Sequence, residues 1–201
     1  VYNNGTVQNC ILTGNTGYRG GGAYNSGLMQ KCLVYGNTSS FRGGGIWNDG
    51  LVLTCVIADN TALYGGGVWN NSLILNATVA KNQSTLGSAG GLFNCLGVVR
   101  NCIIQANGNG DYGEQAGSYA PQYSCAPGLF GEGNLAANPS FADPDRGDFR
   151  LQASSPCVNA GVNLDWMVGA LDLEGNRRIN WNRVDLGAYE HQVRGAALIV
   201  R

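Results

Sequence analysis

The chain carries little charge. Of its 201 residues only 12% are Asp, Glu, Lys or Arg, and the formal net charge is −1. No broad basic field is therefore available to hold nucleic acid or an anionic membrane, and we expect neither as a partner. Long hydrophobic runs are also lacking: the late apolar run at residues 196–200 is far too short to span a bilayer. Low charge together with 44% hydrophobic residues argues against a disordered chain.

Histidine is scarce, and the cysteines do not form a known motif. His191 is the only histidine, so a zinc site, a Cys–His dyad or a Ser–His–Asp triad would have to use it. Seven cysteines cannot all pair within the chain, and no CxxC spacing occurs. We therefore predict no catalytic residue, no metal site and no cofactor, with calcium left open by the Asp-rich run at residues 143–148.

Glycine, in contrast, is abundant, and much of it belongs to a repeat. A Gly-Gly-Gly-apolar-aromatic-Asn motif occupies residues 20–25, 43–48 and 65–70, and a degenerate copy occupies residues 89–94. The closing asparagines recur at intervals of 22, 23, 22 and 24 residues, counting one from the opening Val-Tyr-Asn: Asn3, Asn25, Asn48, Asn70 and Asn94. Self-similarity at such a period is the signature of a solenoid or repeat array.

Two further columns keep the same phase. One holds small residues, each followed two positions later by an aliphatic residue: Cys10, Cys32, Cys55, Ala77 and Cys102. The other holds only asparagine: Asn15, Asn37, Asn60, Asn82 and Asn107. An asparagine repeated at one bend can hydrogen-bond to the asparagine of the next coil and satisfy buried turn backbone. We therefore predict a structural asparagine ladder.

Short alternating apolar runs without a 3.6-residue period predict strands. Glycine triplets and β-branched residues disfavour the main rival, a helical repeat. We predict an all-β fold, a right-handed parallel β-helix of about 22 residues per coil with three short strands in each coil. The chain is expected to form one continuous domain with four parts: 1–107 regular coils, 108–133 an irregular loop or insertion, 134–191 closing β-helix coils, and 192–201 a C-terminal tail.

The region after the repeats contains strand-like runs and short motifs. The strand-like runs lie at residues 148–152, 156–161 and 183–190. The motifs are NPSFADP (138–144), GDFRL (147–151), SPCVNAG (155–161), DLEGNRR (172–178) and VDLGAYE (184–190). Together they resemble the closing module of secreted β-helix proteins of the choice-of-anchor Q type. The glycine and asparagine columns are also similar to polymorphic-outer-membrane-protein repeats, within the pectate-lyase-like superfamily. The resemblance implies export and a secreted or cell-surface location, but no single activity.

Aromatic side chains form another column. Its members are Tyr2, Tyr24, Trp47, Trp69 and Phe93. Each aromatic residue stands between two residues that we place in the interior, so the alternation of side chains along a strand points its ring outward. Exposed aromatics in a row can stack on sugar rings or bury against a partner chain. Tyr24, Trp47, Trp69 and Phe93 are therefore candidate ligand- or partner-binding residues. The alternative is structural, with the rings packed under the 108–133 loop or stabilising the sheet through one another.

Charged residues offer few candidate sites. Arg19 and Arg42 occupy equivalent positions of two coils and could contact an anionic glycan, as arginines do in the β-helix lyases that the chain resembles; solvated turn arginines are the alternative. The run at 143–148 lacks the terminal Glu of a calcium loop and fits a turn before a strand. Asp172, Arg178 and Asp185 are expected to form a structural ion pair.

The cysteines divide into two groups. Cys10, Cys32 and Cys55 share a column and should stack in the interior as small hydrophobic residues. Cys95, Cys125 and Cys157 lie outside that column. If one disulfide forms, we expect it among these three, and we predict the pair Cys95–Cys125.

Two functional classes follow from these patterns. The first is an extracellular or cell-surface β-solenoid that acts as a structural, adhesive or fibre-forming protein, with a polysaccharide as one candidate partner. The second is a polysaccharide lyase or glycoside hydrolase on the same scaffold. We favour the first, because Asp49, Asp59 and Asp111 do not fall in one column and no carboxylate cluster is evident.

The chain starts within a coil, which would give the first coil an open parallel edge. Either further coils precede it in a longer parent or another subunit covers it. Repeated head-to-tail self-association through this coil would yield a filament. The apolar run at residues 196–200 is a candidate to cover such an edge.

Overall fold

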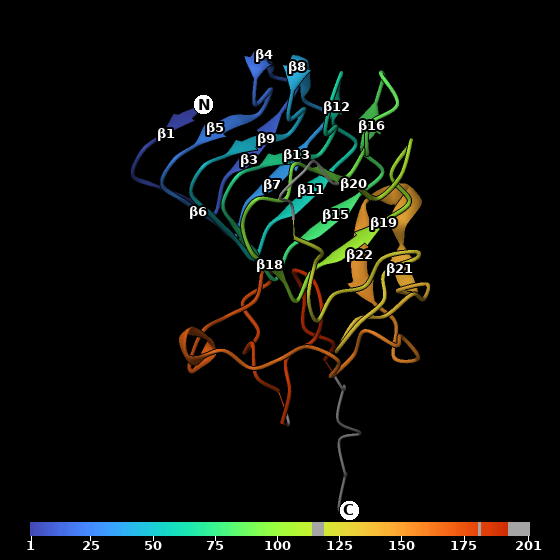
Figure 1. The fold of residues 1–201 in the computed structure, drawn as a ribbon. Helices are drawn as coiled ribbons and strands as arrows, with labels where there is room; N and C mark the ends of the chain where they lie inside the picture. The colour runs from blue at the N-terminus through green and yellow to red at the C-terminus, as the bar shows by residue number, and fades with distance from the viewer. Residues whose placement is uncertain (114–118, 181, 193–201) are drawn as a thin grey trace, which may run out of the picture.

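The repeats fold into a parallel β-solenoid. The structure, a computed structural model, describes residues 1–113, 119–180 and 182–192. The chain makes about five turns, and each turn sets a residue beside its equivalent roughly 22 positions further on, as in the pairing of Asn3 with Asn25. Figure 1 shows the turns following one another along a single axis. The predicted all-β solenoid and its period are confirmed; the apolar run at 196–200 lies outside the described residues.

The glycine–aromatic–asparagine motif builds the first sheet. Its strands pair in parallel in the order β1 (Tyr2–Asn3), β5 (Ala23–Asn25), β9 (Ile46–Asn48), β13 (Val68–Asn70), β17 (Leu92–Phe93) and β20 (Tyr112–Gly113). The apolar residue and the asparagine of β5, β9 and β13 are fully buried. The aromatic residue between them therefore points away from the interior, as the alternation of a strand requires.

Two more sheets complete a coil of three strands. The second sheet contains β2 (Thr6–Gln8), β6 (Leu28–Gln30), β10 (Leu51–Leu53), β14 (Leu73–Leu75) and β18 (Val99–Arg100). The third contains β3 (Ile11–Thr13), β7 (Leu33–Tyr35), β11 (Val56–Ala58), β15 (Thr78–Ala80) and β19 (Ile103–Gln105). Each strand lies in register with the strand one coil away.

A fourth, shorter sheet joins the first four coils. It consists of β4 (Thr16–Arg19), β8 (Thr38–Arg42), β12 (Thr61–Ala62) and β16 (Gln83–Ser84). In Figure 1 these strands stand at the top of the view, at one corner of the coils. The sheet sets Arg19 beside Arg42, as their equivalent positions in the sequence predict.

The corner between the second and third sheets requires a left-handed backbone. Lys31 has φ of 51°, and the following Cys32 thiol donates a hydrogen bond of 3.2 Å to the carbonyl oxygen of Gln30. The same arrangement recurs at Thr54, with φ of 54°, and Cys55. The cysteine column is thus a hydrogen-bonding device as well as a small apolar filling.

The glycine triplet allows neighbouring coils to approach closely. A Cβ atom on Gly44 would lie 2.3 Å from the carbonyl oxygen of Gly66 and 2.4 Å from that of Thr61. Backbone atoms cannot move aside as a flexible side chain can. Any side chain at this position would therefore push two coils apart.

The interior of the solenoid is filled by apolar residues from successive coils. The core includes Ala23, Met29, Val34, Ile46, Val52, Ile57, Ile74, Val79 and Ile104. Cys32, Cys55 and Cys102 are fully buried among them, and Cys10 is half-buried against them. The predicted interior cysteine column is therefore confirmed.

The stack continues irregularly beyond β19. Isolated parallel bridges join Arg100 to Gln122 and Ile103 to Cys125. Ala126 and Leu129 of this turn are buried in the solenoid core. The chain here extends the hydrophobic core without forming regular strands.

The segment that follows packs against the side of the solenoid. It contains an antiparallel hairpin of β21 (Phe141–Asp143) and β22 (Asp148–Leu151), with the 3₁₀ helix η1 (Pro144–Arg146) between them, and a second 3₁₀ helix, η2 (Asp165–Met167). The strand predicted at 148–152 is thus present as β22. The runs at 156–161 and 183–190 are not strands, and that prediction was wrong.

This closing segment covers the outer face of the third sheet. Phe141, Phe149 and Leu186 form a second apolar cluster with Ala58 of β11 and Ile103 of β19. Burying two such faces against each other stabilises the fold by roughly 1.5–3 kcal/mol for each large side chain. Figure 1 shows the segment, in orange and red, beside and below the later coils.

Candidate functional site

The predicted asparagine ladder is present and continuous. Each side-chain amide nitrogen donates to the amide oxygen of the next coil over distances of 2.9–3.0 Å, in the order Asn15, Asn37, Asn60, Asn82 and Asn107. The ladder ends on a carboxylate, because Asn107 Nδ2 donates to Asp111 Oδ1 at 2.8 Å. The repeat gave no sign of Asp111, because this residue lies four positions after Asn107 and belongs to none of the periodic columns.

A second ladder runs inside the first sheet. Asn3, Asn25 and Asn48 each donate to the asparagine of the next coil at 2.7–2.8 Å, and the series reaches Asn70. These asparagines mark the repeat in the sequence, but their hydrogen bonds to one another were not predicted. Their constant spacing was the signal that could have revealed the ladder.

The aromatic column stacks as predicted, but its two tryptophans are not open to solvent. Ring centroids lie 5.9 Å apart between Tyr24 and Trp47, 5.5 Å between Trp47 and Trp69, and 5.4 Å between Trp69 and Phe93. Trp47 and Trp69 are only 7% and 4% exposed, whereas Tyr2 at the end of the column is 71% exposed. The rings point outward as predicted, but the prediction that they are accessible was wrong for the two tryptophans.

The predicted arginines cover these tryptophans. The guanidinium carbon of Arg19 lies 4.7 Å from the ring centroid of Trp47, and that of Arg42 lies 4.0 Å from Trp69. Arg42 also lies 4.4 Å from the ring of Phe41, so its guanidinium group is held between two aromatic faces. Cation–π contact of this kind fixes the position of a charge that would otherwise move freely.

Asp49 connects the column through hydrogen bonds. Its carboxylate accepts from Tyr24 Oη at 2.6 Å, Trp47 Nε1 at 2.8 Å and Asn71 Nδ2 at 2.6 Å. Partial burial acts to raise the pKa of Asp49, but the hydrogen bonds from Tyr24, Asn71 and Trp47 outweigh it and hold the pKa below its ordinary value. Donating to this carboxylate raises the pKa of Tyr24. A tyrosine with a raised pKa stays protonated and is a poor general base.

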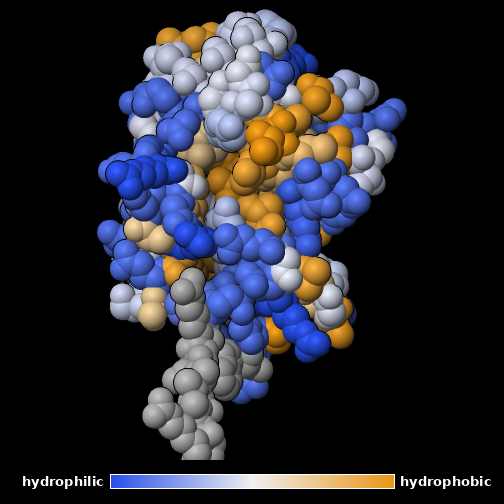
Figure 2. Space-filling view, turned by 180° about the vertical axis from the view of Figure 1, so that it is seen from behind, coloured by the Kyte–Doolittle hydropathy of each residue, from blue (hydrophilic) through white to orange (hydrophobic). Residues whose placement is uncertain are grey.

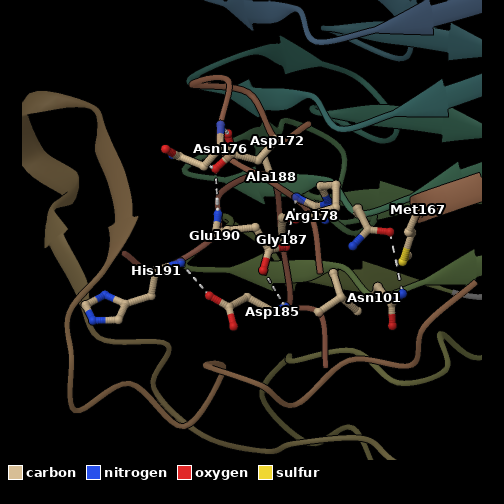
Figure 3. Close-up of polar contacts among 12 residues, drawn as sticks. Asn101, Met167, Asp172, Asn176, Arg178, Asp185, Gly187, Ala188, Glu190 and His191 are labelled. Atoms are coloured by element: carbon tan, nitrogen blue, oxygen red, sulfur yellow. Dashed lines mark hydrogen bonds and ion pairs between the residues drawn. The ribbon is translucent and has the colours of Figure 1, made fainter. Parts of the chain in front are cut away.

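A cluster of buried charged residues lies in the closing segment. Figure 3 shows Arg178 and Glu190 side by side, with Asp172 and Asp185 close by. Arg178 Nη1 lies 3.3 Å from Glu190 Oε1, and both side chains are almost completely buried. Arg178 was predicted to pair with Asp172 or Asp185; its ion-pair partner is Glu190, and that expectation was wrong.

The carboxylates of this cluster hold the irregular backbone. Asp172 accepts hydrogen bonds from the backbone nitrogens of Asn176 and Glu190, at 2.7 and 2.8 Å. Asp185 accepts from the backbone nitrogen of His191 at 2.5 Å. The segment satisfies its backbone through these side chains instead of through strand pairing, which explains why its strand-like runs form turns.

Burial changes the protonation of this cluster. Removal from water raises the pKa of Glu190 to about 9, although Arg178 acts in the opposite direction. Burial also raises the pKa of Asp185. Burial therefore acts against the charged form of Glu190, which the contact with Arg178 favours.

The Asp-rich run forms a turn, as predicted. Pro144–Arg146 is the 3₁₀ helix η1, and Asp143 lies 3.7 Å from Arg146. Among the described residues, no group of three or more His, Cys, Asp or Glu side chains could hold a metal ion. Within the same residues, no helix is long and apolar enough to cross a membrane.

The predicted Cys95–Cys125 disulfide is not formed. Cys95 lies in the solenoid core, whereas Cys125 lies in the second apolar cluster under the closing segment. Cys125 instead neighbours Cys157, and both thiols are unoxidised.

A groove separates the closing segment from the early coils. It has a volume of about 440 Å³ and is lined by Leu33, Tyr35 and Val56 on one side and by Asp145 and Phe149 on the other. Figure 2 shows hydrophobic residues gathered on one face of the molecule and bordered by hydrophilic ones.

No protein-family model, curated protein or solved structure matches this chain. The fold and the site geometry define it as a parallel β-solenoid with asparagine ladders. The resemblance to choice-of-anchor Q and pectate-lyase-like proteins stays a prediction.

Proposed function

We propose that this protein is a structural or adhesive β-solenoid that works outside the cell, secreted or on the cell surface. The observation that carries the proposal is the set of side-chain ladders that cross each coil boundary from Asn15 to Asn107. Such ladders couple each coil to the next and favour a stiff rod with extended faces. The location is supported by the resemblance of the closing segment to secreted β-helix proteins.

The adhesive contact that the geometry favours is with an acidic polysaccharide. Arg19 and Arg42 stand one coil apart, about 4.8 Å in a parallel sheet, and both are held on tryptophan rings. Tyr18 beside them is 64% exposed. Fixed guanidinium groups lose little freedom when they bind carboxylates, so this strip suits a polyuronate better than a neutral glycan.

Binding to immobilised polygalacturonate at low and high salt tests this contact. Arg19→Gln and Arg42→Gln should each weaken binding several-fold. Arg146→Gln is the matched control, because it removes the same charge from an exposed side chain on the η1 turn and should bind like the unaltered protein. Equal binding by all the variants would contradict the role of the arginine strip.

The same assay examines the enzymatic alternative. Release of unsaturated uronates, followed by ultraviolet absorbance with and without Ca²⁺, would replace the adhesive proposal with a polysaccharide lyase. Loss of all binding to acidic and neutral glycans would leave only the structural role.

Head-to-tail self-association is part of the same proposal. The strands β1, β2, β3 and β4 are each the end strand of their sheet, and a further coil would extend all four. Light scattering over a wide concentration range should show growth in mass. A monomer at all concentrations would contradict it.

A further inference from the structure

Two buried thiols meet where the closing segment covers the solenoid. The backbone of Cys125 forms an isolated parallel β-bridge with Ile103 of β19, and both side chains lie in the cluster on the outer face of the third sheet. Cys157 comes from the closing segment, and its carbonyl oxygen accepts a hydrogen bond of 3.0 Å from the backbone nitrogen of Leu186. Both cysteines are fully buried in the second apolar cluster, and each thiol is close enough to shift the pKa of the other.

This approach differs from that of the cysteine column. Cys32 and Cys55 stand on successive coils of one column, so their Cα–Cβ bonds are parallel and about 4.8 Å apart. A disulfide needs Cβ atoms roughly 3.5–4.5 Å apart and side chains turned toward each other. Cys125 lies on the outward side of the last turn and Cys157 lies in the segment that covers it, so the two side chains come from different layers.

We propose that Cys125 and Cys157 form a disulfide that fastens the closing segment to the last turn of the solenoid, with a small disulfide such as oxidised glutathione as the oxidant. The Cys125 thiolate attacks one glutathione sulfur, and the other leaves as a thiolate. The Cys157 thiolate then attacks the Cys125 sulfur of the mixed disulfide and releases the second glutathione. One S–S bond replaces two S–H bonds, and both protons end on the released glutathione.

Burial sets when this exchange can occur. Both thiols are inaccessible in the folded protein, so attack on an external disulfide requires the closing segment to open. The disulfide should therefore form readily during refolding and slowly in folded protein. This inference does not depend on the proposed function.

Refolding the full chain in reduced and oxidised glutathione tests the pair. After an acid quench, free thiols are alkylated and the chain is cut with trypsin and chymotrypsin, which separates Cys102 from Cys125 after Tyr123. We expect a linked peptide pair that contains Cys125 and Cys157, and two fewer alkylated thiols than after refolding in reductant. A folded protein with Cys125 unlinked, or linked to another cysteine, overturns the proposal.

Matched variants separate the disulfide from simple packing. Cys157→Ala should lose both the linked peptide and the rise in thermal midpoint on oxidation. Cys102→Ala, which alters a fully buried cysteine of the inner column, should keep both. If Cys157→Ala does not fold, the peptide map of the unaltered protein decides the question.

Discussion

Replacing Asn60, a fully buried member of the ladder, by alanine should strongly destabilise the fold. Asn60 is fully buried, and its amide makes four hydrogen bonds. Its nitrogen donates to Val34 O and to Asn82 Oδ1, both at 2.9 Å. Its oxygen accepts from the backbone nitrogen of Asn37 at 2.9 Å and from Asn37 Nδ2 at 3.0 Å.

The cost can be worked out from what each partner keeps. Asn37 Nδ2 retains acceptors at Leu12 O and Tyr35 O, so its loss is small. The backbone nitrogen of Asn37 loses its side-chain acceptor inside the protein, where an unsatisfied donor costs about 1–3 kcal/mol. With the remaining bonds at about 0.5–1.5 kcal/mol each, we expect a loss of about 3 kcal/mol.

Urea unfolding followed by circular dichroism measures this loss. For a chain of this length, 3 kcal/mol corresponds to a fall in the thermal midpoint of roughly 6–12 °C. Asn15→Ala is the matched control, because Asn15 occupies the same column at an exposed position and should cost less than about 1 kcal/mol. If the two variants lose equal stability, the ladder does not contribute in the way described.

Three other predictions concern the arginine strip, the buried charges and the glycine triplet. Arg42→Ala should expose Trp69, shift its fluorescence to longer wavelength and lower the free energy of unfolding by about 1 kcal/mol. Arg42→Gln also removes the cation, so it should have the same effects if the charge of Arg42 is what matters. The pKa of Glu190 in the folded protein, about 9, lies above its ordinary value of 4.5, so the stability that Glu190 contributes is complete below pH 4.5 and is lost as the pH rises through 9. Glu190→Gln should therefore reduce the fall of the urea midpoint with rising pH. An unchanged slope of urea midpoint against pH would contradict this prediction. Gly44→Ala should lower the free energy of unfolding, measured in urea, by about 3 kcal/mol. Gly5→Ala, whose added Cβ meets nothing within 4 Å, should lower it by less than about 1 kcal/mol. Equal losses would show that the close approach of the coils at Gly44 is not what excludes a side chain.

The regular coils could be predicted because each column is a local rule repeated at a fixed period. Asn37, Asn60 and Asn82 fill the same environment, so one structural explanation serves all three. The register of every strand follows once the period is known, and Asn3 pairs with Asn25 as the spacing requires. In a solenoid each coil contacts only the coils next to it, so the structure of the whole array follows from one pair of neighbouring coils.

The closing segment and the surface could not be predicted in the same way. Strand propensity at residues 183–190 loses to the buried carboxylates of Asp172 and Asp185, which bind the backbone directly. The alternation of residues along the strand predicted that the Trp69 ring points outward. It could not predict how exposed the ring is, because Arg42 covers it from a different sheet. Contacts that occur once leave no periodic trace in a sequence.

The direction of the asparagine ladder gives the solenoid a polarity. Each amide from Asn15 onward donates toward the following coil, so the amide dipoles add and the positive end lies at Asn107. Asp111 accepts there from both the side chain and the backbone nitrogen of Asn107, at 2.8 and 2.9 Å. A carboxylate at the positive end of aligned dipoles is favourable for the reason that acidic residues favour helix N-termini. The asparagine ladder therefore ends where a carboxylate replaces the next amide.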